Sequence, residues 1–482
     1  MSATNQGPGA TVSESGQRNT NTITDTIRIR LREPARLRNL ELLLLVFAII
    51  INAASILLVQ LGALGEVRKE VFTYSAALAV LALAMHVTLR IAASQADPFI
   101  LPIATVLNGI GIAMIYRLDL AGDREGWAAS GIRQMAWTAI AMLAAFIVLV
   151  VIRNHRVLQR YRYIAMFVGI ALLLLPLVPG LGREINGSQV WIGIGPQRAD
   201  GSVPLSFQPG ELAKIALAVF FAGYLVTARD SLSLVGKKFL GMRLPRVRDL
   251  GPILIIWVAA MGVLVLQRDL GTSLLYFGLF LVMIYVATGR ISWVILGMTL
   301  FIGGAVAASQ LLGYVNSRFN GWLDAFDNAI YEQIGGSYQL VQGLFGIADG
   351  GLVGTGLGQG SPDMVPFAES DFIIASLGEE LGLAGLFALL SLFLLFVSRG
   401  FRIGFAGQDD FGRLLGTGLA FVIALQVFIV IGGITRVIPL TGLTTPFMAA
   451  GGSSLVANWI IAALLLRLSD TVRNQPRLVV DA

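Results

Sequence analysis

The sequence contains no cysteine and only two histidines, His86 and His155. The absence of cysteine excludes disulfide bonds, thiolate metal sites and a cysteine nucleophile. Two histidines leave no histidine-based metal cluster and no Ser-His-Asp triad to consider. Charged residues make up only 13% of the chain, whereas a typical soluble protein has about a quarter. The composition therefore excludes an ordinary soluble enzyme.

The sequence is rich in long apolar stretches. Of its 482 residues 56% are hydrophobic, and the mean hydropathy is +0.76. Apolar stretches of about 20 residues, enough to cross a bilayer as a helix, recur along the chain. We therefore expect an all-α polytopic membrane protein with about twelve transmembrane helices. The expected spans are residues 39–62, 71–94, 97–117, 134–152, 162–180, 209–228, 249–267, 270–288, 291–313, 371–398, 412–434 and 444–466.

The distribution of basic residues predicts the orientation of these spans. If the basic N-terminus stays in the cytoplasm, about 24 Lys and Arg fall on the cytoplasmic side and about 10 outside, as the positive-inside rule requires. Residues 1–38 are then a disordered, basic cytoplasmic tail with no cleavable signal, and residues 471–482 are a cytoplasmic C-terminal tail. Two long loops, about 181–208 and 314–370, lie on the extracytoplasmic side. Long ordered loops are usually functional, so we expect the working face to be outside.

The segment VPFAESDFIIASLGEELG, residues 365–382, places several carboxylates at the start of an apolar run. Carboxylates inside a membrane are costly and usually functional. Asp371 would lie at the outer mouth of the tenth span, either as a helix cap or as a working group. Glu379 would lie roughly 12 Å deeper. We expect one of Glu379 and Glu380 to face the interior and pair with a cation.

Few cations are available for such a role. Lys214 follows Glu211 by one turn in QPGELAK, so the two charges either neutralise each other or also serve a polar cavity that holds an anionic substrate. Arg318 and Arg436 are among the rare basic residues outside, and either could bind a phosphate. Asp269, in QRDLGT, falls at a tight turn for which a solvated position is favoured. These residues alone leave both a transporter and a lipid-handling enzyme open.

Signature blocks in a fixed order narrow this choice. NGSQVWIGIG, FQPGELAK, QRDLGT, YQLVQGLFGIADGGLVGTGLGQG, FAESDFIIASLGEELGLAG and PLTGLTTPFMAAGGSS together resemble the SEDS family of shape, elongation, division and sporulation proteins, such as RodA and FtsW. The resemblance covers roughly residues 97–470, a core of ten spans, and is strongest to the actinobacterial RodA branch. The two helices in residues 39–96 would be an N-terminal addition to this membrane core.

The resemblance implies a peptidoglycan glycosyltransferase of the bacterial cytoplasmic membrane. Such an enzyme polymerises lipid II into glycan strands at the outer face, for cell elongation and shape, and works with a class B penicillin-binding protein, a transpeptidase. Its ligands would be lipid II, the undecaprenyl-pyrophosphate-linked glycan and membrane lipids, with no nucleic acid. No cofactor is identified. The sequence has no dedicated metal motif, and a divalent cation, Mg or Mn, would be held partly by the pyrophosphate itself.

The resemblance also implies roles for individual residues. The family's essential aspartate, in its TDF block, falls on Asp371 in the SDF of this sequence, which implies a general base in an inverting reaction. Its buried Glu and Lys fall on Glu211 and Lys214, and Asp269 is retained although Arg268 replaces a proline. We expect Glu211, Lys214, Asp269, Arg318, Glu379 and Arg436 to contribute to substrate binding. Val190, Ala449 and Ala450 depart from the family pattern, so the roles of the usual residues there do not carry over.

Three alternatives to this interpretation stay open, one of them a scaffold that only holds the penicillin-binding protein. A lipid II flippase would need polar residues that continue from the outer cavity to the cytoplasmic side, whereas most charges in these spans lie in their outer half. Only sequence similarity to the RodA branch distinguishes an elongation enzyme from a division-specific polymerase of the FtsW type.

Overall fold

The computed structural model describes residues 34–185, 187–194, 205–233, 265–333 and 335–474, with a few residues between 238 and 263. In these parts of the chain, ten helices are long and apolar enough to cross a membrane. They are α1 (Pro34–Leu64), α2 (Glu70–Ala92), α3 (Ile100–Ala121), α4 (Ser130–Val151), α7 (Pro209–Ser233), α9 (Leu270–Thr288), α10 (Ile291–Leu311), α14 (Ile373–Ala406), α15 (Asp410–Ile434) and α16 (Gly452–Arg473).

Shorter elements connect these helices. The short helices are α5 (Arg156–Arg160), α6 (Arg162–Leu174), α11 (Gly313–Leu323), α12 (Asn328–Tyr331) and α13 (Tyr338–Gly350), with 3-10 turns η1 (Gly126–Ala128), η2 (Leu175–Leu177) and η3 (Pro362–Met364). The strands are β1 (Gly182–Ile185), β2 (Ser188–Ile194), β3 (Leu205–Phe207), β4 (Lys238–Phe239) and β5 (Met242–Arg243). Strands β1, β2 and β3 form an antiparallel sheet in that order, and β4 pairs with β5.

The polytopic helical fold predicted from hydropathy is confirmed. Ten of the expected spans coincide with the ten long helices, with shifted boundaries. The expected span 162–180 is the shorter apolar segment Arg162–Leu177, and the expected span 249–267 lies largely outside the described residues. The largest shift of a helix start is at α16, which begins at Gly452 instead of residue 444.

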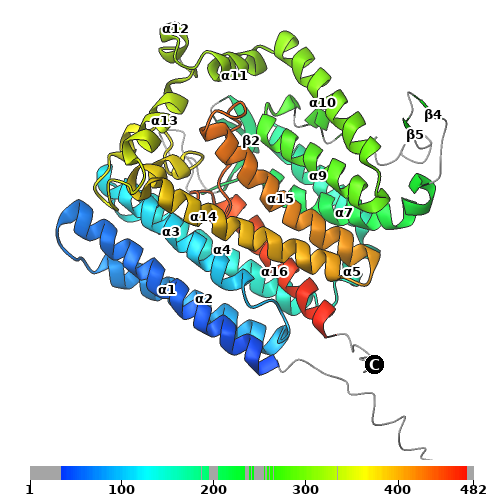
Figure 1. Ribbon diagram of the computed structural model, residues 1–482, viewed down its shortest axis with the longest axis horizontal. Helices are drawn as coiled ribbons and strands as arrows, with labels where there is room; N and C mark the ends of the chain where they lie inside the picture. The colour runs from blue at the N-terminus through cyan, green and yellow to red at the C-terminus, as the bar shows by residue number, and fades with distance from the viewer. Residues whose placement is uncertain are drawn as a thin grey trace, which may run out of the picture.

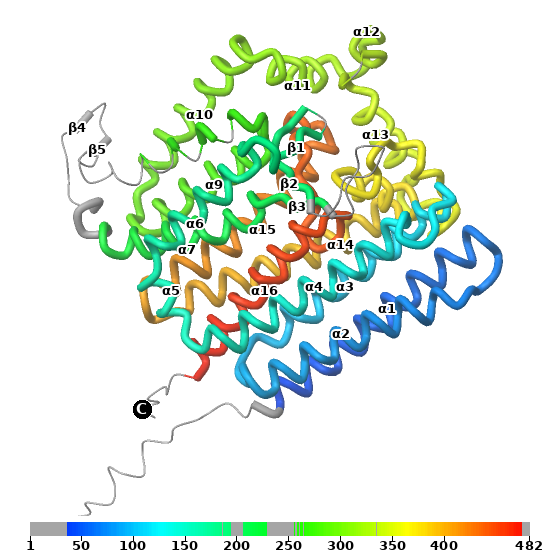
Figure 2. Tube along the Cα trace, turned by 180° about the vertical axis from the view of Figure 1, so that it is seen from behind, coloured from blue at the N-terminus to red at the C-terminus, as the bar shows by residue number. Residues whose placement is uncertain are grey.

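The helices form a bundle with two different ends (Figure 1). The terminal end holds the start of α1, the α2–α3 connection, α5 and the end of α16. The loop end holds the α1–α2 connection, α11 to α13 and the start of α14. Helices α1 and α2 lie at one edge of the bundle beside α3 (Figure 1). Seen from behind, the β1–β2–β3 sheet lies at the loop end, where β3 contacts α16 (Figure 2).

Burial distinguishes the centre of the bundle from its lipid-facing rim. The apolar window of α3 is 94% buried, whereas that of α10 is only 6% buried. Helix α3 is therefore a central helix, and α10 exposes nearly all of its apolar surface in the way a helix does when it faces lipid.

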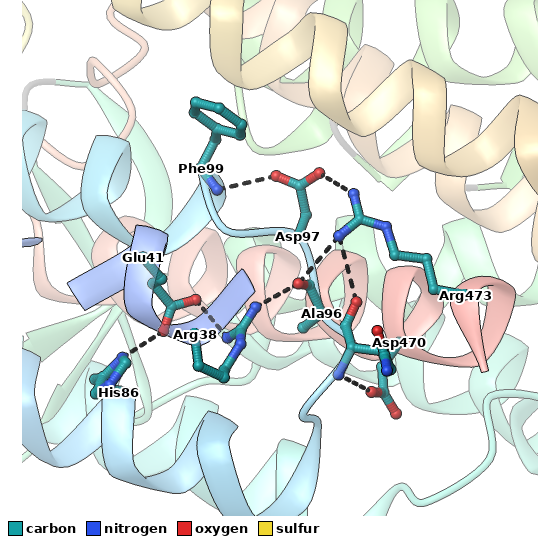
Figure 3. Close-up of polar contacts among 9 residues, drawn as sticks. Arg38, Glu41, His86, Ala96, Asp97, Phe99, Asp470 and Arg473 are labelled. Carbon is teal, nitrogen blue, oxygen red and sulfur yellow. Dashed lines mark hydrogen bonds and ion pairs between the residues drawn. The ribbon is translucent and has the colours of Figure 1, made fainter. Parts of the chain in front are cut away.

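At the terminal end, buried charges join α1 and α2 to the rest of the bundle (Figure 3). Arg38 donates to Glu41 at 2.5 Å, and Glu41 contacts the Nδ1 atom of His86 at 2.7 Å. Arg38 also donates to the carbonyl of Ala96, in the α2–α3 connection. In the same connection Asp97 accepts from Arg473 of α16 at 2.7 Å. The two N-terminal helices are thus fixed to the core through the buried Arg38, Glu41 and His86 group, and the partly exposed Arg473 holds the adjoining connection through Asp97.

Candidate functional site

Asp371 lies at the loop end, just before α14. The helix begins at Ile373, its N-cap residue is Phe372, and no side-chain cap hydrogen bond is made there. The capping interpretation of Asp371 is therefore wrong. Its half-buried carboxylate instead accepts a hydrogen bond from the hydroxyl of Ser370 at 2.9 Å.

Burial changes the acidity of this carboxyl group. Loss of solvation raises the pKa of Asp371 above its ordinary value, and the Ser370 hydrogen bond, the charge of Arg318 and the Gln339 side chain offset only part of that rise. A carboxylate with a raised pKa is a stronger proton acceptor, which suits a general base.

Arg318 connects Asp371 with a second carboxylate of the loop end. It belongs to α11 and donates to the carbonyl of Leu440 at 2.9 Å. Its positive charge acts on Asp371 and also on Asp269. The structure therefore brings one predicted cation and two predicted carboxylates into the same region.

Asp269 occupies the N-cap of α9. Its carboxylate accepts from the backbone N–H of Thr272 at 2.9 Å. Burial is the main reason that its pKa is raised, and the Glu211 charge adds to that rise. Arg268 is exposed, as expected for a solvated turn. The expectation is wrong for Asp269, because its carboxylate is half-buried and caps the helix.

Glu211 and Lys214 form a buried pair in the first turns of α7. The Lys214 ammonium lies 2.6 Å from the Glu211 carboxylate. It also donates to the amide oxygens of Gln426 in α15 at 3.0 Å and Asn458 in α16 at 3.4 Å. Because the Lys214 side chain is only 2% exposed, this ammonium holds three helices together, and its partners leave it poorly placed for a direct substrate contact.

Arg436 is placed where α15 ends. Its guanidinium donates to the carbonyls of Trp322 at 2.7 Å and Leu323 at 2.5 Å, and lies 5.4 Å from the ring centre of Phe326. It therefore fixes the C-terminal end of α11, the helix that carries Arg318.

Helix α14 is broken near its start. Gly382 has φ 67° and ψ −174°, which no helix contains, and a Cβ there would lie 2.3 Å from the backbone nitrogen of Gly354. Residues 373–381 are therefore a separate half-helix, and Asp371 lies two residues before it. Below it, the continuous part of α14 runs from residue 383 to Ala406.

The glycine-rich loop, residues 351–361, fills this break. The N–H groups of Thr355 and Gly356 donate to the carbonyls of Glu379 and Glu380, each at 3.0 Å. In return, the N–H groups of Leu383 and Ala384 donate to the carbonyls of Gly351 and Leu352, each at 3.0 Å. Backbone groups that the break would leave unpaired in a membrane are satisfied in this way.

The two glutamates at the end of the half-helix are both buried. Glu380 pairs with Arg117 of α3 at 3.0 Å and accepts from the N–H of Gly358 at 2.8 Å. Glu379 accepts from the N–H of Ser361 at 2.5 Å. The expected interior ion pair is thus present on Glu380, and its cation is Arg117, which we did not predict. Glu379 contacts the glycine-rich loop, away from the Asp371 carboxylate.

Two pockets formed by described residues lie at the loop end. The larger, about 530 Å³, lies between the end of α1 and the glycine-rich loop. The other, about 280 Å³, is lined by the amides of Asn316, Asn320 and Gln333. Asp371 lines neither pocket. Among the described residues, no group of three or more His, Cys, Asp or Glu side chains is arranged to hold a metal ion.

The residues that sequence reasoning missed are polar groups inside apolar helices. Arg117 is the clearest, because it stands near the end of the third span in MIYRLDLA, where an intramembrane cation signals a buried partner. Gln426 and Asn458 gave a weaker signal, as single amides in otherwise apolar runs.

Comparison with known proteins identifies the family. The family model of the FtsW, RodA and SpoVE cell cycle proteins matches residues 98–474. The chain is 45% identical over 443 residues to the peptidoglycan glycosyltransferase RodA of Mycobacterium tuberculosis, covering 91% of this chain and 92% of that protein. It is 32% identical to stage V sporulation protein E of Bacillus subtilis, covering 77% and 96% of the two chains.

Solved structures give the same result for the fold. A chain from a study titled "Structural coordination of polymerization and crosslinking by a peptidoglycan synthase complex" is 26% identical, with a TM-score of 0.54 over 84% of this chain and 98% of that one. The rod shape determining protein RodA of Thermus thermophilus is similar in fold, with 23% identity and a TM-score of 0.53 over 79% and 98%. The chain therefore belongs to the SEDS family, the group that includes RodA, FtsW and SpoVE.

Proposed function

We propose that this protein is a peptidoglycan glycosyltransferase that polymerises lipid II and uses Asp371 as its general base. The main support for this activity is sequence similarity. Over 91% of its length, the chain is 45% identical to RodA proteins that are named peptidoglycan glycosyltransferases. The assignment of the base is supported by a half-buried carboxylate that caps no helix and has a raised pKa.

In the proposed reaction, Asp371 accepts the proton of the sugar 4-hydroxyl of an acceptor lipid II. The oxygen attacks the anomeric carbon of the growing chain, undecaprenyl pyrophosphate leaves, and the configuration inverts. General-base assistance contributes on the order of 10²–10⁴ in rate. The Ser370 hydrogen bond holds the carboxylate in one orientation, so that it need not be ordered when the substrate binds.

Arg318 is the cation best placed to act on the departing pyrophosphate. Its charge already acts on Asp371, whereas the guanidinium of Arg436 is engaged by carbonyls at the end of α11 and Lys214 by its buried partners. We assign Glu211, Lys214, Asp269, Glu379 and Arg436 to shaping the substrate site, not to direct chemistry. A divalent cation would be bound mainly through the pyrophosphate oxygens.

The protein is a multi-pass membrane protein, and we assign it to the bacterial cytoplasmic membrane. The excess of Lys and Arg on the side of the termini supports cytoplasmic N- and C-termini. The loop end, with Asp371, then faces outward. Lipid II would keep its polyprenyl tail in the bilayer while its sugars meet the carboxylate at the surface.

A class B penicillin-binding protein is the proposed partner. Support comes from the structural similarity to a chain of a peptidoglycan synthase complex that coordinates polymerisation and crosslinking. The greater identity to mycobacterial RodA than to SpoVE or FtsW relatives supports a role in elongation and shape.

The test is a polymerisation assay of the purified chain with its partner and lipid II, with products separated on a gel. Wild type should make glycan strands, and Asp371→Asn should make them at least 100 times more slowly, by the lower bound for a lost base. Strands made by Asp371→Asn at the wild-type rate would refute the base. A wild-type protein that moves labelled lipid II across liposomes without lengthening it would be a flippase, and the proposed function would be wrong.

A further inference from the structure

The half-helix that begins just after Asp371 is not held in place by a continuous helix. Gly382 interrupts α14, so the position of residues 373–381 depends on what packs around them. Their C-terminal end is bound by the glycine-rich loop through the backbone hydrogen bonds described above. What fixes the glycine-rich loop therefore also fixes the start of α14.

Helix α1 contacts this loop without any intervening side chain. A Cβ added at Gly62 would lie 2.1 Å from the carbonyl oxygen of Leu357, and one at Gly358 would lie 2.6 Å from the carbonyl oxygen of Val59. The side-chain amide of Gln359 also donates to the carbonyl of Gly62 at 2.6 Å. Two facing glycines thus allow the backbones of α1 and the loop to touch.

Arg117 ties the same loop to the central helix α3. Besides its ion pair with Glu380, it donates to the carbonyl of Gly360 at 2.6 Å. The neighbouring Tyr116 accepts at its hydroxyl from the side-chain amide of Gln60 at 2.8 Å. Helix α1, helix α3 and the loop are therefore joined at one point.

The opposite end of α1 is also fixed. The buried cluster of Arg38, Glu41 and His86 holds α1 against α2, and Arg38 reaches the α2–α3 connection at Ala96 (Figure 3). A helix anchored at both ends can resist displacement of a loop that presses on it. The family model begins at residue 98, so this helix pair lies outside the residues that it matches.

We propose that the α1–α2 pair and Arg117 form a brace that positions the half-helix, and with it Asp371, for polymerisation. Gly62, Gln359 and Arg117 are then positioning residues that touch no substrate. The proposal rests on the proposed function, because it takes Asp371 as the base. A displacement of about 1 Å at a reacting group can lower a rate about 100-fold, so loosening the brace should slow catalysis.

The experiment compares Gly62→Val with Gly303→Val in the full-length protein with its partner. Both replace a helical glycine, but a Cβ at Gly303, in α10, meets nothing within 4 Å. The brace predicts that Gly62→Val lowers kcat at least about tenfold while KM for lipid II stays close to that of wild type. Hydrogen exchange should speed up in residues 351–361 and 373–381, and Gly303→Val should change none of these quantities.

Two further variants cover the case in which Gly62→Val does not fold. Gln359→Ala removes one hydrogen bond from an exposed side chain, and Arg117→Lys keeps the charge but loses the fork that serves Glu380 and Gly360 together. Each should lower kcat per folded molecule by less than Gly62→Val would and should loosen residues 351–361.

The outcomes separate the brace from the proposed function. The brace is overturned if Gly62→Val and Gln359→Ala keep the wild-type kcat, or if activity falls only in proportion to the folded fraction. If Asp371→Asn is as active as wild type, the base assignment fails. Hydrogen exchange in residues 373–381 then still decides whether α1 holds the half-helix, and unchanged exchange in Gly62→Val overturns the brace.

Discussion

Replacing Lys214 by methionine tests whether the polar centre of the bundle is a paired structure. The substitution keeps an apolar stem of similar length and removes an ammonium that lies 2.6 Å from the Glu211 carboxylate. Gln426 and Asn458 lose a donor at the same time. Since the Glu211 side chain is only 5% exposed, little water can replace the lost partner.

The expected cost follows from that burial. Removing one partner of a buried ion pair costs about 3–5 kcal/mol, because the other charge is left uncompensated. We therefore expect Lys214→Met to lower the unfolding midpoint by on the order of 5–10 °C. The double variant Glu211→Gln with Lys214→Met removes both charges and should recover most of this loss. Reversing both charges should recover part of it.

The assay is thermal unfolding of the purified protein in detergent, followed together with lipid II polymerisation. The matched control is Lys69→Met, since Lys69 is exposed in the α1–α2 connection and should melt like wild type. The reasoning is refuted if Lys214→Met also melts like wild type. It is refuted equally if the double variant is no more stable than the single one.

Four other predictions concern single positions. Because burial raises the pKa of Asp371, the polymerisation rate should fall on acidification at a higher pH than an ordinary aspartate would give. Ser370→Ala removes a hydrogen bond that lowers this pKa. It should therefore shift the acidic limb of the pH–rate profile to a still higher pH. Burial raises the pKa of Asp409, but hydrogen bonds to its carboxylate outweigh it and bring the pKa to about 2; its stabilisation is therefore present above pH 3.8 and lost as pH falls towards about 2. Asp409→Asn should cost about 2 kcal/mol at pH 7 and only a small part of that at pH 2, where the carboxyl group is about half protonated, as measured by melting at both pH values. Gly382→Ala places a side chain on a backbone of positive φ and against Gly354, so it should lower both the melting temperature and kcat. Wild-type values of both would show that the break contributes to neither stability nor catalysis.

Hydropathy predicted the helices well because the membrane imposes their length and composition locally. It failed where the chain is apolar without being helical. Residues 444–451 are apolar or small enough to extend the last span, yet Phe447 has a positive φ of 65° and α16 begins only at Gly452. The loop before β2 also contains Asn-Gly, a hairpin signal that a search for spans does not use.

From the sequence we predicted which residues of the site carry charge, but not which of them pair with each other. Lys214 was matched to Glu211 because their partnership is local in sequence. Arg117 and Glu380 are 263 residues apart, and nothing in either segment identifies the other. The break in α14 was missed for the same reason, because Gly382 resembles any glycine in a transmembrane helix until the glycine-rich loop is seen to complete it.

The interruption at Gly382 also matches the protein to the thickness of a bilayer. An unbroken α14 of 34 residues would be about 51 Å long, whereas the hydrocarbon layer is about 30 Å thick. The part after Gly382, residues 383–406, is about 36 Å long and crosses that layer alone. The half-helix of residues 373–381 is then not needed for the crossing itself. In the proposed function, it would present Asp371 to the sugars of a polyprenyl-linked precursor whose tail stays in the hydrocarbon layer.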